Sequence, residues 1–458
     1  HPLPERAMPT VATDALLEEI QELIRERERD GVAGLAERVG PSEWAALVPR
    51  LDPSEVAVLL QWLPDEEIPQ LLEELDPHAA AAILRTLSRQ EAATLLAGMD
   101  PDDAADVVEN LTEPEISQIL VRMDPAEAEE IRRLSDFKPD SAGGIMTPEF
   151  VAVTADATAD SAIAAIRGLV GSAETVDYVY VVDAERHLIG VLSLYRLMLS
   201  PGMTPVTELI APTTVRVRAS ADRETAANLL TERNLLAIPV VDDEDHLLGI
   251  ITQDDVADVL EAEATEDIER LGGSQPLNVP YRLSSVALLV RKRIGWLLLL
   301  FIAEAYTGSV LRAFSLELEQ AVALSFFIPL LIGTGGNVGS QTVTLIVRAM
   351  ALNEVSLRDV GWIVWKELRV GLIMGAIMAV VAIGRAQLLG VGTNIGLVVA
   401  VTILAISVWS ATVAAVLPLT LRRLRIDPAV VSAPLITTLV DGTGLIIYFE
   451  IAKVLLRI

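Results

Sequence analysis

The sequence predicts a multidomain chain. An all-α helical-repeat domain, a tandem pair of α/β domains, an acidic connecting helix and a five-helix α transmembrane domain are expected in that order. Three observations support this division: short helical segments recur every 12 residues near the start, a mixed α/β segment then occurs twice, and long apolar segments fill the last part. We place the domains at 1–138, 139–253, 254–280 and 281–458.

Charge divides the chain in the same way. The 458 residues carry a net charge of -29, although 52% of them are hydrophobic. Residues 281–458 hold 15 basic and 9 acidic residues, whereas residues 1–280 hold 20 basic and 55 acidic ones. Such an acidic part repels nucleic acid and attracts cations. Cysteine is absent, which excludes disulfides and thiolate metal sites.

The helical repeat has seven successive units, which start at residues 52, 64, 76, 88, 100, 112 and 124. Most units open with Asp, Ser or Thr, several place Pro next, and each closes on Leu or Met, which is typical of short helices joined by tight turns. One such helix cannot bury its apolar face alone, so we expect the units to stack. The array is either a protein-binding solenoid or a regulatory lever.

The second repeat aligns MTPEFVAVTADAT with IAPTTVRVRASAD, and YVVDAERHLIGVLS with PVVDDEDHLLGIIT. Short first strands are expected at 150–153 and 214–217, and each copy alternates strands with a helix, which predicts an α/β unit. The pattern resembles a pair of cystathionine-β-synthase-type (CBS) domains, which implies a regulatory module that is often dimeric and sometimes binds an adenine nucleotide such as ATP.

Two histidines, His187 and His246, occupy equivalent turns in the two copies. No second histidine or carboxylate lies at ligand spacing in a helix, so we interpret both as solvated turn residues rather than metal ligands.

The connecting helix, residues 254–271, has an apolar stripe and is acidic elsewhere. Like charges three and four residues apart are unfavourable unless a cation binds or the helix is solvated. Two interpretations stay open: a solvated spacer, or a helix whose position depends on divalent ions.

Five apolar segments are long enough to cross a bilayer, near residues 294–314, 321–350, 360–389, 394–421 and 430–456. Basic residues precede the first segment (Arg291, Lys292, Arg293) and follow the fourth (Arg422, Arg423). Positive loops stay inside, so we place the N-terminal domains in the cytoplasm and the C-terminus outside a cell (inner) membrane.

The last segment carries one carboxylate, Asp441, near its middle. A charge at membrane depth costs at least about 2.5 kcal/mol, so it should face a bundle interior, a partner or water. Gly442, Gly444 and Pro434 flank it, and such residues allow close helix approach or a cavity lining. We predict a cation pathway with Asp441 in its wall. Glu304, in the first segment, is either part of a packed pair or a second conduction residue.

The second segment contains IGTGGNVGSQ, in which four glycines surround Asn337 and precede Ser340 and Gln341. The spacing and the apolar flanks do not match a phosphate-binding loop, so we favour close helix packing. A pore lining by Asn337, Ser340 and Gln341 is compatible with that packing.

The stretches AGGIMTPEFVAV, DDVADVLEAEATEDI, IGTGGNVGSQ and PLITTLVDGTGLIIY resemble the MgtE family of magnesium channels and transporters over nearly the whole chain. The resemblance implies a homodimer with a pore along its two-fold axis. Asp441 of each subunit would hold a hydrated Mg²⁺ ion, assisted by backbone carbonyls of Thr437 and Gly444. Magnesium dehydrates reluctantly, which suits carboxylates that contact its water shell.

The resemblance also implies feedback, in which cytoplasmic Mg²⁺ bridges carboxylates of the soluble domains and the connecting (plug) helix and closes the pore. The matching sensor positions are Asp102, Asp106, Asp222, Glu224, Asp255, Asp258, Glu263, Glu266, Asp267 and Asp427. Two positions depart from the family pattern. Ala433 stands where relatives can carry Asn at the inner mouth of the pore, and Asn234 stands where an acidic sensor residue can occur.

We therefore predict a magnesium-selective channel for Mg²⁺ uptake that cytoplasmic Mg²⁺ gates. One alternative is an ion-coupled divalent-cation carrier or exporter. Another is a membrane-anchored Mg²⁺ or nucleotide sensor, which would leave Asp441 unexplained. An enzyme is not expected, because no segment combines a nucleophile, a base and an orienting group.

Overall fold

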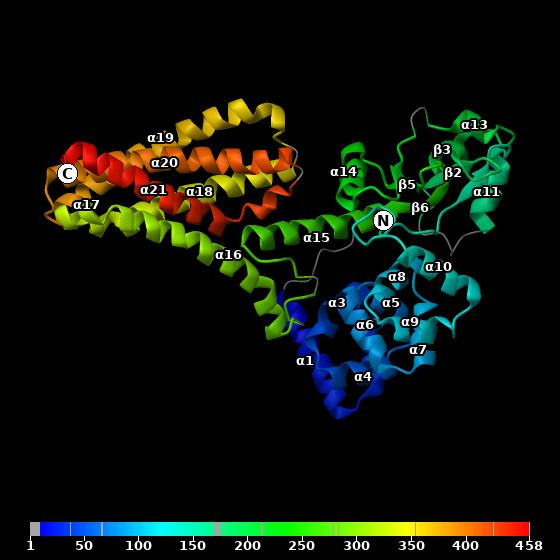
Figure 1. Cartoon of the computed structure of the whole chain (residues 1–458). Helices are drawn as coiled ribbons and strands as arrows, with labels where there is room; N and C mark the ends of the chain where they lie inside the picture. Colours follow the sequence, from blue (N-terminus) through cyan, green and yellow to red (C-terminus); the bar gives the residue numbers. More distant parts are fainter. Residues whose placement is uncertain are drawn as a thin grey trace. The chain divides into compact units, whose positions relative to one another are not determined.

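The computed structural model describes residues 10–36, 38–65, 67–168, 175, 177–211, 214–277, 279–282, 284–352, 354–424 and 426–457. The chain forms two compact units, of which the first comprises residues 1–263 with 279–283 and the second comprises residues 264–278 with 284–458. Figure 1 shows an all-helical start in blue, strands in green, and long helices from yellow-green to red.

The first part of the first unit is a helical array, as predicted. Its elements are α1 (Thr10–Glu26), α2 (Arg29–Ala36), α3 (Pro41–Leu47), η1 (Val48–Arg50), α4 (Pro53–Trp62), α5 (Ile68–Glu73), α6 (Pro77–Thr86), α7 (Arg89–Leu96), α8 (Pro101–Glu109), α9 (Glu113–Leu120) and α10 (Pro125–Ser135). Each 12-residue unit supplies one helix from α4 onward. The ninth residue of five successive units is buried and at most 3% exposed: Leu72, Leu84, Leu96, Val108 and Leu120. The repeat thus sets which face of each helix enters the core.

One unit departs from the repeat. Helix α5 begins at Ile68, four residues after the start of its unit at Pro64. Proline is tolerated in the first turn of a helix but breaks its interior, and Pro69 therefore requires the helix to begin just before it.

Two small sheets follow the array. The first copy contains β1 (Ala152–Thr154), α11 (Ala159–Gly168), β2 (Tyr178–Val182), β3 (Leu188–Ser193), α12 (Leu194–Leu199) and α13 (Val206–Leu209). The second contains β4 (Val217–Arg218), α14 (Arg223–Arg233), β5 (Ala237–Val241) and β6 (Leu247–Thr252). In both copies the first strand is parallel to the second, and the second is antiparallel to the third.

The first strand of each copy starts later than predicted. Strand β1 begins at Ala152 rather than Phe150, and β4 begins at Val217 rather than Thr214, because only the later residues pair in register with β2 and β5. Alternating apolar residues indicate extended chain, but the partner strand decides how many of them join a ladder.

The connecting helix, α15, spans Gln253–Leu271, beginning in the first unit and ending in the second. The later elements are α16 (Val286–Ala313), α17 (Ser315–Gln320), η2 (Val322–Phe327), α18 (Ile328–Ala351), η3 (Leu357–Asp359), α19 (Val360–Leu388), α20 (Thr393–Arg423), η4 (Pro428–Val430) and α21 (Ala433–Leu456). Glycines bring α19 close to α20, since a Cβ on Gly375 would lie 3.0 Å from Cα of Leu404.

Three segments of the described chain are long and apolar enough to span a membrane: Val322–Ala351, Leu357–Leu388 and Thr393–Arg423. The other two predicted spans correspond to α16 and α21, which carry Glu304 and Asp441. Charged residues lower the hydropathy of any window that contains them. The count of five spans stays a prediction, as do the domain boundaries.

Candidate functional site

Asp441 lies near the middle of α21, within the helical bundle of the second unit. Helix α21 starts after Ser432, whose Oγ accepts a hydrogen bond from the Leu435 amide at 3.3 Å. The Asp441 side chain is half-buried, and among the described residues its buried Oδ1 atom has no hydrogen-bond partner. The charge of Glu304 on α16 is close enough to repel it. A buried carboxylate oxygen without a partner is costly, so this position calls for water, an ion or a second chain.

The glycine cluster of α18 packs against the first turns of α21. A Cβ on Gly336 would lie 2.8 Å from Cγ2 of Thr437, and one on Gly339 would lie 2.5 Å from Cγ2 of Ile436. Ser410 of α20 donates a hydrogen bond of 2.6 Å to the carbonyl of Gly335. The glycines therefore allow the close packing that the sequence indicated, and this packing positions the turns just before Asp441.

The other predicted pore residues lie on α18 and α21. Asn337 and Gln341 are exposed and four residues apart, so they share one face of α18 that this chain leaves uncovered. Thr437 donates its hydroxyl to the Pro434 carbonyl at 2.8 Å, and Gly444 packs near Ile406. Ala433 is the first residue of α21. Whether these residues line a pore stays a prediction.

A second candidate site lies in the first unit, where α8 meets the beginning of α15. Burial, followed by the charges of Asp102 and Glu73, raises the pKa of Asp103 to about 9. Burial and Glu109 raise the pKa of Asp106 to about 7. Burial also raises the pKa of Asp255 to about 6, although hydrogen bonds from Thr252 oppose this. Carboxylates crowded in this way ionise more readily when a cation lies between them.

Three carboxylates of this cluster were missed from the sequence: Glu73, Asp100 and Asp103. Their ligand atoms lie within 4.8 Å of one another. The Asp100 amide also donates to Oε1 of Glu73 at 2.9 Å. The run Asp100-Pro-Asp-Asp at the start of a repeat unit was a usable signal, because it places several carboxylates in one helical turn. Glu73 comes from α5, and only the stacking of the array brings it there.

Several predicted sensor residues already have protein partners. Asp222 caps α14, where its side chain accepts from the amides of Glu224 at 2.9 Å and Thr225 at 3.3 Å. Glu263 forms an ion pair with Arg223 at 2.9 Å. These contacts give Asp222 and Glu263 structural roles that do not need a metal.

The remaining sensor positions lie along α15 and before α21. Arg270 forms ion pairs with both Glu266 and Asp427. Burial, followed by Glu261, raises the pKa of Asp258, and Asp267 lies in the same helix. The sequence interpretation missed both Arg223 and Arg270, although Arg223 stands directly between Asp222 and Glu224.

Asn234 departs from the family pattern for a local reason. It ends α14 in the left-handed conformation, with φ of 50° and ψ of 47°. Asparagine adopts this conformation more readily than most residues, so it suits the C-terminal cap.

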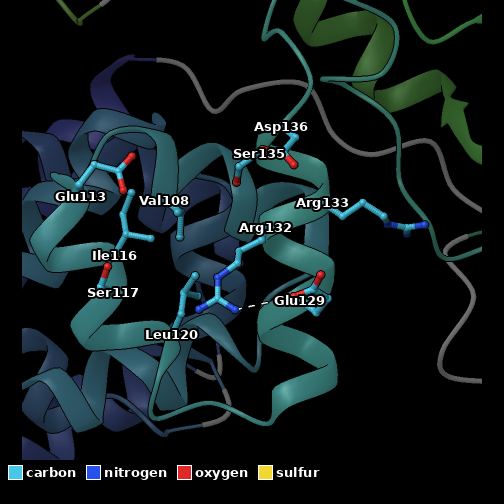
Figure 2. Close-up of a pocket in the computed structure, with 10 residues that line it drawn as sticks. All are labelled: Val108, Glu113, Ile116, Ser117, Leu120, Glu129, Arg132, Arg133, Ser135 and Asp136. Carbon is cyan, nitrogen blue, oxygen red and sulfur yellow. Dashed lines mark ion pairs between the residues drawn. The ribbon is translucent and has the colours of Figure 1, made fainter.

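A pocket of about 470 Å³ lies elsewhere in the array, between α8, α9 and α10. Figure 2 shows Arg132 pointing into it and forming an ion pair of 3.8 Å with Glu129 of the same helix, α10, opposite Ile116 and Leu120. None of the predicted site residues lines this pocket.

Comparison with known protein families gives consistent matches along the chain. The MgtE family described as a divalent cation transporter matches residues 328–451. The MgtE intracellular N domain matches residues 39–140, and the CBS domain matches residues 142–200 and 206–262.

Individual proteins agree with these matches. The magnesium transporter MgtE of Thermus thermophilus is 42% identical over 72% of this chain and 73% of its own length. That of Bacillus subtilis is 32% identical over 70% and 71% of the two chains. The crystal structure of the cytosolic domain of the Mg²⁺ channel MgtE in complex with ATP is 33% identical. It covers 53% of this chain and 99% of its own, with a TM-score of 0.51. The chain therefore belongs to the MgtE family of divalent cation transporters.

Proposed function

We propose that this chain is a magnesium channel that mediates Mg²⁺ uptake and closes when cytoplasmic Mg²⁺ is high. The observation that carries the proposal is Asp441, whose buried Oδ1 lacks a partner among the described residues. It lies in an apolar helix inside the region that matches the transporter family. The names of the relatives, which are magnesium transporters, support Mg²⁺ as the transported ion.

The pore is proposed to form between two copies of the chain within the lipid membrane. The uncovered face with Asn337 and Gln341 supports a second copy, because polar side chains in a membrane segment should face a partner or water. Two Asp441 carboxylates would balance the charge of one divalent ion. Mg²⁺ would keep most of its water shell, which the carbonyls of Thr437 and Gly444 would also contact. Because Ala433 stands where relatives can carry Asn, the inner mouth of the pore would lack the carboxamide of that residue.

The gate is proposed to lie on the cytoplasmic side, with the C-terminus outside. Mg²⁺ between Asp103, Asp106 and Asp255 would offset the burial and the repulsion that raise their pKa values and would hold α15 against α8. Helix α15 continues directly into the second unit, so ions bound at its beginning can affect its end. The further proposed sensor residues are Asp102, Asp222, Glu224, Asp258, Glu263, Glu266, Asp267 and Asp427. We also propose that the CBS pair binds ATP, as does the similar cytosolic domain.

The decisive experiment records Mg²⁺ currents from liposomes that contain the full chain, with no sodium or proton gradient. Asp441→Asn should abolish the current, because the amide keeps the shape but removes the charge. Glu450→Gln is the matched control, since this exposed acid lies on the same helix. An Asp441→Asn channel with wild-type current would refute the pore assignment. A strict need for a sodium or proton gradient would instead support a coupled carrier.

A further inference from the structure

Two equivalent turns of the CBS pair each bring a histidine and two carboxylates together. We call them the first His turn (Asp183, Glu185, His187) and the second His turn (Asp242, Glu244, His246). In each turn Nδ1 of the histidine lies 2.8 Å from Oδ2 of the aspartate four residues earlier. The three ligand atoms of each turn lie within 4.8 Å of one another. These ligands do not need to lie one turn apart on a helix, because the turn itself brings the aspartate back next to the histidine.

Each turn is held rigidly by its own backbone. Oδ1 of Asp183 accepts from the amides of Glu185 at 3.0 Å and His187 at 2.8 Å. Oδ1 of Asp242 accepts from the equivalent amides of its turn, each at 2.8 Å. The second oxygen of each aspartate is therefore presented to the histidine in a fixed position. A cation that replaced the hydrogen-bonded proton would find this oxygen and nitrogen already oriented.

The fold places the two His turns against each other. The imidazole rings stack with centroids 4.3 Å apart and an angle of 20° between their planes. Backbone hydrogen bonds hold the arrangement: the Leu188 amide donates to the Asp245 carbonyl at 2.9 Å, and the Leu247 amide donates to the Arg186 carbonyl at 3.0 Å. The pair thus combines two imidazoles and four carboxylates at one place in the first unit.

Only some of the described carboxylates near the two His turns form ion pairs with arginine. Asp243 and Asp245 form ion pairs with Arg218 at 2.6 Å and with Arg216 at 3.3 Å. Among the described residues, no Lys or Arg pairs with the four carboxylates of the His turns. Each turn therefore offers two carboxylates and one neutral imidazole, whose net charge of about -2 matches one divalent cation.

We propose that each His turn is a metal site for a borderline transition dication such as Zn²⁺, separate from the carboxylate sites for Mg²⁺. Imidazole suits Zn²⁺, Co²⁺ or Ni²⁺, whereas Mg²⁺ prefers an all-oxygen shell. Ligands bound at about 2.1 Å in a tetrahedral site lie about 3.4 Å apart, so the oxygen and nitrogen, now 2.8 Å apart, would separate by about 0.6 Å to admit the ion. On binding, the Nδ1 proton would move to Nε2, so that the imidazole stays neutral, and water would complete the coordination.

The test uses the full chain purified in detergent, with millimolar MgCl₂ present to occupy the oxygen-only sites. Equilibrium dialysis against ZnCl₂, followed by elemental analysis, should give about two Zn²⁺ ions per chain. X-ray absorption at the zinc edge should show the outer-shell scattering of imidazole. His187→Gln combined with His246→Gln should weaken zinc binding at least tenfold, on the order of the loss seen when metal-site groups are removed.

His78→Gln is the matched control, because this histidine lies on α6 outside both turns and should leave zinc binding unchanged. Glu185→Gln combined with Glu244→Gln provides a second test that leaves the backbone-bonded aspartates intact, and it should also weaken binding. Retention of zinc by the double histidine variant, or no zinc binding by the wild type above the magnesium-saturated blank, would overturn the proposal. None of these readouts depends on Mg²⁺ transport.

Discussion

Arg270 forms an ion pair with Asp427, so the last turn of α15 is tied to the segment just before α21. The same guanidinium also pairs with Glu266, one turn earlier in α15. Both contacts lie within the second unit. One arginine thus pairs with two carboxylates that the sequence assigned to Mg²⁺ sensing, and it holds them together without a metal.

Arg270→Gln should make channel closure more sensitive to Mg²⁺. Removing the guanidinium leaves Glu266 and Asp427 facing each other, and a divalent cation would then take its place. A partly exposed pair is worth roughly 0.2 to 1 kcal/mol, so the half-inhibiting Mg²⁺ concentration should fall about threefold. Current recordings over a Mg²⁺ series measure this. Arg233→Gln, an exposed arginine at the end of α14, should cause no change. A higher half-inhibiting concentration would show that Arg270 itself supports closure.

The magnesium-free chain should lose stability as pH rises. The folded pKa values of Asp103, Asp106 and Asp255 are raised above their ordinary value of 3.8, to about 9, 7 and 6. The folded state therefore holds protons that the unfolded state releases. This stabilisation is complete below about pH 4 and is lost as pH rises through about 6, 7 and 9.

Thermal unfolding in a chelator, followed from acidic to alkaline pH, checks this expectation. Added Mg²⁺ should reduce the decline, because the cation stabilises the ionised carboxylates. Asp103→Asn should flatten the alkaline part of the profile, whereas Asp136→Asn, at the end of α10, should leave it unchanged. An unaltered profile in Asp103→Asn would contradict the assignment of this group.

Gly339→Ala should lower both stability and transport. The added methyl group would lie 2.5 Å from Cγ2 of Ile436 and 2.7 Å from Oγ of Ser410, so these side chains or the helices that carry them would have to shift. Overpacking of this kind costs about 1 to 3 kcal/mol. Gly333→Ala is a close control, because a Cβ there meets nothing within 4 Å. Thermal unfolding and Mg²⁺ flux should separate the two variants; equal behaviour would mean that this contact does not position Asp441.

Substitutions of Asp222 can separate helix capping from ion sensing. Asp222→Ala should destabilise the chain by about 1 kcal/mol, because α14 loses its N-terminal cap. Asp222→Asn keeps a capping oxygen but removes the charge, so its unfolding temperature should stay near that of the wild type. If Asp222 also binds Mg²⁺, Asp222→Asn alone should raise the Mg²⁺ concentration needed for closure. Wild-type gating in that variant would limit Asp222 to capping.

Much of the site followed from local patterns. Asp441 stood out because a charge in an apolar helix is rare, and the four glycines around Asn337 indicated close packing. Membership of a transporter family confirms that an enzyme was not to be expected. Asp106 and Asp255 were found through the resemblance. The structure adds Asp100 and Asp103, which share one acidic run at the start of α8, and Glu73, which lies in α5 and has no sequence signal that links it to them.

The sequence by itself determined the order of the domains, the repeat that buries Leu72, Leu84 and Leu96, and the apolar helix that contains Asp441. These features are periodic or compositional, so neighbouring residues are enough to specify them. Tertiary structure alone decided that Arg270 meets Asp427 and that His187 stacks on His246. These partners are 157 and 59 positions apart, and only the packing of separate elements decides which distant side chains meet.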